Sequence, residues 1–329
     1  MDLLTPEQLS NYLFRVNLSI LTVPVKPDLQ TLCRIHLAHV QNIPYENLSL
    51  HLSKANQQFP GIIIQTGSLF RKIVQHGRGG YCFEQNLLFA AALKACGFSI
   101  YLLQIRTLKG PAVPVPDALR VHMAVGVVLD GIHWHCDVGY GGKGLRLPIR
   151  NDLVQTSKDG KFASVSNKED KTYTESTLCS ELYKDVQDVW QAAHGTCSGY
   201  GHRLRTKSTS ENTTENTTAN TTLQIQLPGL FMQALDSKGC FQDLYFFHLQ
   251  ETKFPEFLLL NWYTSTCPLA SHLNNTVVAM QTPDGRHTYD GKEFKVFTGT
   301  KLAWSKHAQS EDEVYFHLKQ LFNLKFDAA

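Results

Sequence analysis

The sequence lacks three patterns that mark other classes of protein. No uninterrupted apolar run is long enough to span a bilayer. The formal net charge at pH 7 is only +2, which gives no reason to expect binding to nucleic acid or to an anionic membrane. The eight cysteines are scattered, and no two of them form a Cys-x-x-Cys pair. This cysteine usage fits a reduced cytosol best.

The first residues also lack the basic region of a signal peptide. Thr5, Pro6 and Gln8 have the pattern of a capping box instead, which predicts the start of a helix. With 329 residues, 43% of them hydrophobic and 18% charged, the chain has the composition of a soluble globular enzyme. We therefore expect a cytoplasmic protein, and a monomer.

Two segments lack the patterns of regular structure. Residues 158–172 are charged and polar, and residues 208–222 are a low-complexity run of Ser, Thr, Asn and Glu, which predicts disorder. Asn212, Asn216 and Asn220 each begin an Asn-x-Thr sequon, which would be glycosylated only in a secreted protein. The sequence suggests no function for this insertion.

The hydrophobic pattern divides the chain into three parts. Residues 1–98 have helical spacing, residues 99–232 are rich in strand patterns, and residues 233–329 mix strands with a final helix. Ser310 and Glu313 have the capping-box spacing at the start of that last helix. The pattern predicts an α+β protein of three domains, with the disordered insertion in the second.

The most informative motif is Arg78-Gly79-Gly80-Tyr81-Cys82. Its glycines break regular structure before Cys82, and the apolar run that follows has helical spacing up to Gly97. Cys82 is therefore predicted in the first turn of a helix. There the unpaired backbone N–H groups and the helix dipole favour the thiolate, which is the form that attacks carbonyl groups. The alternative is a buried structural cysteine, which is the commoner case for a lone cysteine.

A hairpin downstream supplies two further groups. Residues 120–129 and 132–138 have the pattern of strands, and Asp130-Gly131 between them is a strong signal for a two-residue turn. In the register that this turn fixes, one face of the hairpin is wholly apolar. The opposite face carries His122 and, diagonal to it, Asp137. Such diagonal neighbours lie about 7–8 Å apart at the backbone, which leaves room for a hydrogen bond between their side chains.

Cys82, His122 and Asp137 are thus a candidate catalytic triad. The cysteine would attack, the imidazole would take its proton and later return it, and the carboxylate would fix the imidazole tautomer and stabilise its charged form. Ala124 and Gly126 are small, so the same face of the hairpin is expected to have space for a partner or substrate.

His133 and His135 invite a second interpretation, a metal site beside Cys136. The two histidines share one strand face, but Cys136 points to the other face, and the sequence has no second cluster of cysteine or histidine with ligand spacing. We therefore expect no metal, and we place these histidines on the polar part of the hairpin face.

Several motifs together resemble the arylamine N-acetyltransferase family. They are residues 43–48 (Ile-Pro-Tyr-Glu-Asn-Leu), residues 78–82 with Asn86, His122 in a strand, residues 137–141 (Asp-Val-Gly-Tyr-Gly), residues 261–268 and residues 281–286. The resemblance covers about residues 1–145 and 240–325. The motif around Cys82 is the most specific of them.

The resemblance implies a fold: a helical N-terminal bundle (1–98) that carries the nucleophile, a β-barrel-like domain (99–232) that carries the histidine and aspartate, and an α/β lid (233–329). These parts would surround a Cys-His-Asp core similar to that of cysteine proteases and transglutaminases. The implied activity is ping-pong transfer of an acyl group from acyl-CoA to an arylamine, in xenobiotic detoxification. Acetyl-CoA would be the donor, or malonyl-CoA, with no permanently bound cofactor.

Two other functions would be compatible with the same residues. One is a cysteine hydrolase or transglutaminase-like enzyme with the same triad, which would need an open peptide groove and access for water. The other is a binding protein that keeps the fold without catalysis. Release of CoA that depends on an arylamine would separate the transferase from both.

The resemblance also implies roles for residues around the triad. Arg78 and Glu46 would form an ion pair behind the helix of Cys82, with Asn86 supporting the same turn; the alternative is two separate surface charges. Contacts to the acceptor would come from Val121 and Tyr140. Contacts to coenzyme A would come from Gly139, Gly141, Tyr263 and Ser271.

Arg106 follows an apolar strand pattern over residues 100–105. One interpretation is a solvated charge at the end of the strand. The other is that Arg106 faces the substrate cleft and binds a carboxylate on the donor, which malonyl-CoA would supply.

Overall fold

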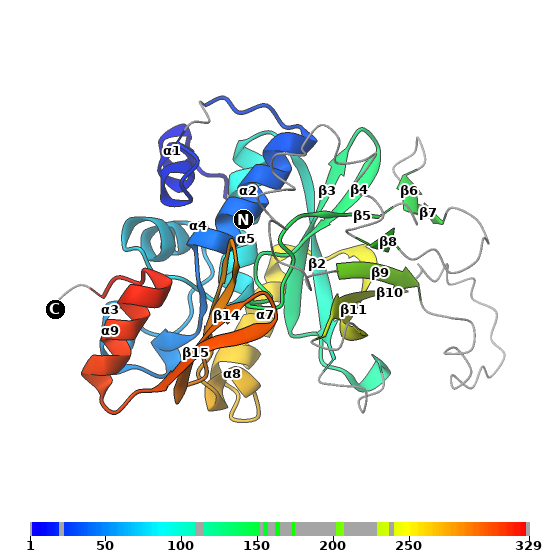
Figure 1. The fold of residues 1–329 in the computed structure, drawn as a ribbon. Coiled ribbons are helices and arrows are strands. Elements are labelled where there is room, and N and C mark those ends of the chain that lie inside the picture. The colour runs from blue at the N-terminus through cyan, green and yellow to red at the C-terminus, as the bar shows by residue number, and fades with distance from the viewer. Residues whose placement is uncertain are drawn as a thin grey trace.

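The computed structural model describes residues 2–19, 23–108, 115–151, 154–156, 162–164, 173–174, 202–206, 229–236 and 240–326. Within them the fold is α+β, as the sequence predicted, with helices gathered on one side of the molecule and a curved sheet on the other (Figure 1). The predicted disordered run 208–222 lies outside the described residues. Of residues 158–172, only the short strand β7 (Phe162–Ser164) is described.

The N-terminal part of the chain is helical. α1 (Pro6–Arg15) begins at the predicted capping box, in which the Thr5 and Gln8 side chains each accept a hydrogen bond from the other residue's amide. The helices that follow are α2 (Leu29–Asn42), η1 (Leu48–Leu50), α3 (Ser53–Gln58), α4 (Thr66–Leu69), the π-helical η2 (Phe70–Gln75) and α5 (Cys82–Ala95). α5 is buried along its length up to Leu93, so it forms the centre of the core.

An eight-stranded antiparallel sheet packs against α5. In spatial order its strands are β5 (Ile149–Asn151), β4 (Ile132–Cys136), β3 (His122–Leu129), β2 (Ser99–Thr107), β11 (Phe241–Glu251), β10 (Gly229–Leu235), β9 (His202–Thr206) and β8 (Tyr173–Thr174). The sheet curls into half a barrel (Figure 1). Met123, Val125 and Trp134 pack on α5, while Leu103 and Tyr245 belong to a second apolar cluster. Both faces of the hairpin are therefore buried.

The β3–β4 hairpin has the predicted register. Val125 pairs with Cys136 and Leu129 with Ile132. The turn residues Asp130 and Gly131 both have positive φ, 50° and 77°, as a type I′ turn requires. The pairing between β3 and β4 ends at Val125 and Cys136. His122 and Asp137 consequently lie where the two strands separate.

A five-stranded antiparallel sheet joins distant parts of the chain. Its order is β1 (Tyr45–Glu46), β12 (Val278–Thr282), β13 (Gly285–Tyr289), β14 (Glu293–Thr298) and β15 (Lys301–His307). Tyr45 of β1 also pairs with Gly80, just before the helix of Cys82, so this sheet brings the C-terminal part of the chain to the start of that helix.

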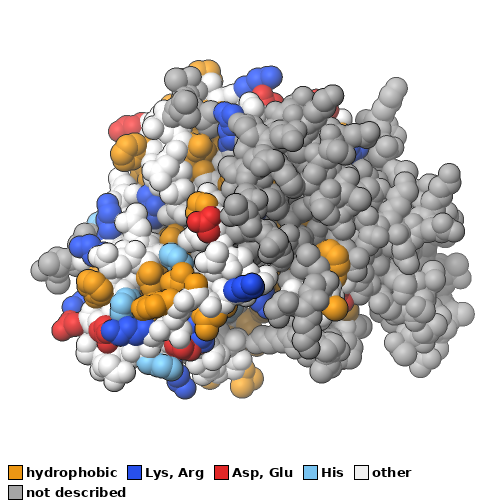
Figure 2. Space-filling view, in the orientation of Figure 1, with side chains coloured by type: hydrophobic (Ala, Val, Ile, Leu, Met, Phe, Trp, Pro, Cys, Tyr) orange, Lys and Arg blue, Asp and Glu red, His pale blue; other side chains and the backbone are white. Residues whose placement is uncertain are grey.

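The last helix, α9 (Glu311–Phe322), packs on this second sheet through Leu318 and Phe322. Ser310 caps it as predicted, because its hydroxyl accepts a hydrogen bond from the Glu313 amide. Figure 2 shows hydrophobic side chains at the surface near α9 and β15, where the exposed large apolar residues are Leu302, Trp304 and Phe316.

The division into three domains stays a prediction. Its boundary between residues 232 and 233 falls inside β10, whose neighbours β9 and β11 belong to the same sheet. β1, from the helical part, pairs with β12 of the C-terminal part. Among the described residues, no helix combines the length and the apolar character that a membrane crossing requires.

Candidate active site

Cys82 is the first residue of α5, as the sequence predicted. Glu84 anchors this end of the helix: its Oε2 accepts a hydrogen bond from the Tyr81 amide at 3.0 Å, and its Oε1 lies 2.7 Å from Lys72 Nζ. Gly80 must lack a side chain, because a Cβ there would lie 2.7 Å from Glu84 Cβ. The glycine turn and Glu84 together fix the position of Cys82 at the helix start.

The turn before Cys82 contains the expected ion pair. Arg78 Nη2 lies 2.9 Å from Glu46 Oε1, and both side chains are fully buried. Burial alone would raise the pKa of Glu46, but the charges of Arg78 and Lys72 lower it. A buried carboxylate of this kind is tolerated only with such partners. The pair connects the turn that presents Cys82 to strand β1.

His122 and Asp137 meet beyond the end of the hairpin. His122 Nε2 lies 2.7 Å from Asp137 Oδ2, and both side chains are buried. Asn86, one helical turn after Cys82, donates to Asp137 Oδ1 at 3.0 Å and accepts a hydrogen bond from the Val138 amide at 3.1 Å. Asn86 thus ties α5 to the carboxylate that orients His122.

Asp137 is ionised at neutral pH. Burial would raise the pKa of its carboxyl group, but the charge of His122 and the hydrogen bonds from His122 and Asn86 lower it to about 2. An ionised carboxylate can only accept hydrogen bonds, so His122 Nε2 carries the hydrogen. In the neutral imidazole Nδ1 is then unprotonated and can take a proton.

The start of α5 favours the Cys82 thiolate, as expected, but burial and a neighbouring charge oppose it. Burial raises the pKa of the Cys82 thiol, and the charge of Asp137 raises it further. The backbone N–H groups of Phe83 and Cys82 lower this pKa but do not offset the other two effects. A reaction at Cys82 therefore requires a base that takes the thiol proton.

The loop after β4 lies directly on the start of α5. A Cβ on Gly139 would lie 2.5 Å from Asn86 Nδ2 and 2.8 Å from the Cys82 carbonyl oxygen, so only glycine allows this approach. The small size of Gly139 thus serves the contact with α5. On the other side, the Cys82 thiol donates to the Val121 carbonyl oxygen at 3.9 Å. Val121 therefore borders the sulfur through its backbone.

Two tyrosine rings flank His122. The ring centre of Tyr140 lies 5.4 Å from that of His122, and the ring centre of Tyr245 lies 5.6 Å from it. Burial and the Asp137 carboxylate raise the pKa of the Tyr245 hydroxyl well above its usual value, so this hydroxyl keeps its proton and can donate to Asp137. Sequence reasoning missed Tyr245, because β11 is distant in the chain and no local motif marks it.

The second face of the hairpin is filled rather than open. A Cβ on Gly126 would lie 2.1 Å from the Tyr101 ring. His133 and His135 are buried here, and their rings lie within 2.9 Å and 2.8 Å of the hydroxyls of Tyr101 and Tyr245. The space predicted on this face is therefore wrong at Gly126, where the Tyr101 ring fills it, whereas His133 and His135 do have polar partners on this face. Within the described ranges no group of three or more potential metal ligands occurs.

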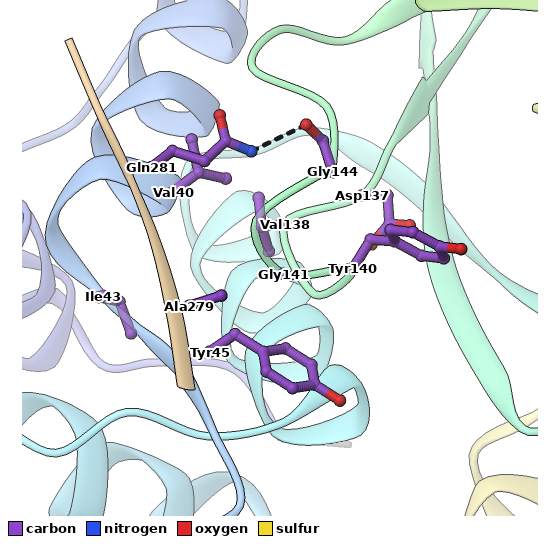
Figure 3. Close-up of a pocket in the computed structure, with 10 residues that line it drawn as sticks. All are labelled: Val40, Ile43, Tyr45, Asp137, Val138, Tyr140, Gly141, Gly144, Ala279 and Gln281. Carbon is purple, nitrogen blue, oxygen red and sulfur yellow. Dashed lines mark hydrogen bonds between the residues drawn. The ribbon is translucent and has the colours of Figure 1, made fainter. Parts of the chain in front are cut away.

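A small cavity lies beside the loop that follows Asp137 (Figure 3). It is lined by Val40, Ile43, Tyr45, Asp137, Val138, Tyr140, Gly141, Gly144, Ala279 and Gln281. Gln281 Nε2 donates to the Gly144 carbonyl oxygen at 2.8 Å, which ties β12 to this loop (Figure 3). A cavity volume of about 10 Å³ is enough for one water molecule and too small for a substrate.

The other residues expected to contact substrates lie on β2 and on two later helices. Arg106 is half-buried near the end of β2, and its Nη1 donates to the Ala118 carbonyl oxygen at 2.5 Å. Tyr263 lies on α7 (Phe254–Thr266), and Ser271 begins α8 (Ser271–Asn274). The contacts of Arg106, Tyr263 and Ser271 with a substrate stay predictions, as do those of Gly139 and Gly141.

α8 is attached to the beginning of the second sheet. His272 Nε2 lies 2.6 Å from the Tyr45 hydroxyl, and Asn47 Nδ2 donates to the carbonyl oxygens of His272 and Asn275 at 2.8 Å each. Sequence reasoning missed His272. The motif at residues 43–48 could have pointed to it, because both of its partners belong to that motif.

Comparisons with known proteins identify the family of this chain. A family model described as N-acetyltransferase matches residues 28–329. The arylamine N-acetyltransferase of Escherichia coli is 32% identical over 210 residues, which are 60% of this chain and 71% of that protein. The pineal gland isozyme of Gallus gallus, also an arylamine N-acetyltransferase, is 26% identical over 317 residues, which are 92% of this chain and 89% of that protein.

Solved structures share the fold. The arylamine N-acetyltransferase of Salmonella typhimurium superposes with a TM-score of 0.69 at 21% identity, over 98% of this chain and 93% of that one. The Mycobacterium marinum enzyme in complex with CoA gives a TM-score of 0.67 at 20% identity, over 96% and 92% of the two chains. Because the family model matches most of its length, the chain belongs to the arylamine N-acetyltransferase family and is an acyltransferase enzyme.

Proposed function

We propose that this protein transfers an acetyl group from acetyl-CoA to the amino group of an arylamine, through a thioester on Cys82. One observation carries the proposal: the 2.7 Å hydrogen bond between His122 and Asp137, held by Asn86 against the helix that begins at Cys82. The relatives' names supply the acyl group and the acceptor, and the CoA complex of a structural neighbour supplies the class of donor.

In the first half-reaction the thiol of Cys82 passes its proton to His122 Nδ1, and the thiolate attacks the thioester carbonyl of acetyl-CoA. The bond between the carbonyl carbon and the CoA sulfur breaks. The leaving CoA thiolate takes the proton from His122, and the acetyl group stays on Cys82. Asp137 remains ionised and stabilises the imidazolium that forms.

In the second half-reaction the arylamine nitrogen attacks the thioester on Cys82. His122 Nδ1 takes a proton from the nitrogen, the bond to Cys82 breaks, and the amide leaves. The proton on His122 returns to Cys82. Tyr140 lies edge to face with His122, and we place the aromatic acceptor against its ring.

The finer features of the resemblance belong to the same proposal. Residues 233–329 would act as a lid over a Cys-His-Asp core, and Tyr263 and Ser271 would contact CoA. Arg106 would favour a donor that carries a carboxylate, such as malonyl-CoA. We place the activity in the detoxification of arylamines in the cytoplasm.

The proposal is tested by the intact mass of the protein after mixing with acetyl-CoA and no amine. We expect one added acetyl group on the wild type, which disappears when an arylamine is added and CoA and amide appear. Cys82→Ala should gain no acetyl group. An equal gain on Cys82→Ala would move the nucleophile elsewhere, and steady release of CoA without an amine would favour the hydrolase instead.

A further inference from the structure

His36 lies in the middle of α2 and is fully buried. Its two ring nitrogens contact the main chain at both ends of the loop 137–146. The Asp137 amide donates to Nε2 at 3.3 Å, and Nδ1 lies 3.0 Å from the Arg146 carbonyl oxygen. One side chain thus holds both ends of the loop whose first residue orients His122.

These two contacts fix the tautomer of His36. A backbone amide can only donate, so Nε2 must be the unprotonated nitrogen that accepts from Asp137. A carbonyl oxygen can only accept, so Nδ1 must carry the hydrogen that it donates to Arg146. Only the neutral imidazole with hydrogen on Nδ1 satisfies both partners.

The two ends of the loop are held in different ways. At the far end Arg146 Nη2 donates to the carbonyl oxygens of Thr282 and Gly285 at 2.8 and 2.7 Å, which anchors the loop to the turn between β12 and β13. At the near end Asn86 binds the carboxylate of Asp137, and His36 binds its main chain. Asn86 also accepts from the Val138 amide, and the Gly139 amide donates to Asp137 Oδ1 at 2.9 Å. His36 is therefore one of several groups that hold this end of the loop, and it binds the main chain of Asp137 itself.

We propose that His36 is a positioning residue for the acyl transfer, which fixes the main chain of Asp137 so that its carboxylate meets His122. The inference rests on the proposed function, because His36 acts only through Asp137 and His122. The Phe89 ring meets His36 edge-on at 5.6 Å between ring centres and limits its movement. A small displacement of an orienting group costs much of the rate that geometry provides.

The titratable and charged groups around His36 come from three elements. His39 lies on the same helix, Asp137 and His135 lie on or beside β4, and Arg146 lies at the end of the loop. The test therefore has to separate His36 from its neighbour His39.

Substituting His36 by glutamine or by asparagine tests its two hydrogen bonds separately, because each amide side chain can replace only one of them. A glutamine can place its amide oxygen near the position of Nε2, and an asparagine can place its amide nitrogen near the position of Nδ1. We expect His36→Gln to acetylate within about threefold of the wild-type rate, and His36→Asn to be slower on the order of tenfold or more, because it leaves the Asp137 amide buried without an acceptor. Equal rates in the two variants would overturn the inference.

The pH profile of Cys82 alkylation by iodoacetamide distinguishes positioning from a general loss of stability. A displaced Asp137 stabilises the charged imidazole less, so in His36→Asn the alkylation rate on the acid side of the profile should fall on the order of tenfold. His39→Gln is the matched control, since His39 also meets Phe89 edge-on but binds Tyr12 and Gln85 instead of the loop. An unshifted profile in His36→Asn, or the same shift in His39→Gln, would refute the role of His36.

Nitrogen NMR of the wild type with labelled histidine tests the inference even if a variant fails to fold. We expect hydrogen on Nδ1 of His36 and none on Nε2; the opposite tautomer, or a doubly protonated ring at neutral pH, would contradict it. Failure of the proposed function can be distinguished from failure of this inference. If wild-type Cys82 takes no acetyl group, the triad is wrong, whereas acetylation that is indifferent to the His36 variants refutes His36 alone.

Discussion

Mild acid should destabilise this protein through two buried histidines. Burial lowers the pKa of His39 to about 3 and that of His135 to about 4. In an unfolded chain a histidine has a pKa of about 6.5. As the pH falls below that value, the unfolded chain binds protons that the folded protein does not, so the free energy of unfolding decreases. The part of the free energy of unfolding that depends on these two neutral histidines is fully present above about pH 6.5 and is lost as the pH falls below that value.

The magnitude follows from the difference between the two states. At pH 5 the pH is about 1.5 units below the pKa of a histidine in the unfolded chain, and each unit corresponds to about 1.36 kcal/mol. Each of the two histidines therefore lowers the free energy of unfolding by about 2 kcal/mol relative to pH 8. The two together cost about 4 kcal/mol, out of the ~5–15 kcal/mol that is typical of a native protein. Glu84 works in the opposite direction and reduces the total, because burial raises the pKa of its carboxyl group.

Urea unfolding at pH 8, 6 and 5 measures this effect. Between pH 8 and pH 5 we expect the free energy of unfolding of His39→Gln to fall by about 2 kcal/mol less than that of the wild type. The variant is less stable at pH 8, because its contacts with Tyr12 and Gln85 are altered. The exposed His307 supplies a control, since His307→Gln should follow the wild type. The same pH dependence in His39→Gln and in the wild type would show that His39 is not held neutral by the fold.

Three further predictions concern the proposed reaction. Asp137→Asn should lower kcat/KM for acetyl-CoA on the order of a thousandfold, far more than His133→Ala, because an amide does not stabilise an imidazolium as a carboxylate does; equal losses would contradict the assigned roles. Arg106→Met should lower kcat/KM for malonyl-CoA about ten- to hundredfold and spare acetyl-CoA, since it removes a charge-assisted bond; an unchanged ratio of the two donors would leave Arg106 a strand-end charge. Deleting residues 208–222 should change Tm and turnover little, because this composition cannot bury apolar surface; lower turnover at equal stability would mean that the segment acts on the site.

The parts of the site that short-range chemistry dictates could be predicted from sequence. The Asp130-Gly131 turn sets the hairpin register, and the register places His122 near Asp137. The glycines before Cys82 mark the start of its helix, because only glycine tolerates the close approach of Glu84 at this turn. Both signals are contained within a few residues of the group that they position.

Contacts between segments that are far apart in the sequence have no such local signal. Tyr245 and His36 approach Asp137 from β11 and α2, and neither lies in a pattern that distinguishes it from an ordinary core residue. The effects that oppose the Cys82 thiolate also lie outside the local sequence. The pKa of Cys82 is dominated by burial, which depends on how the whole chain packs around the helix start and not on the helix itself.

The pairing of β1 with β12 also bears on how the chain folds during synthesis. Tyr45 pairs with Ala279 and Glu46 with Val278, so a strand that precedes the helix of Cys82 finds its partner only after most of the chain has left the ribosome. Until then β1 has an unpaired edge, which is a site for wrong association. Contacts of such long sequence separation also slow folding, because loop closure must come first. The second sheet thus completes the surroundings of Cys82 late, and a nascent chain carries the nucleophile well before it carries an enclosed site.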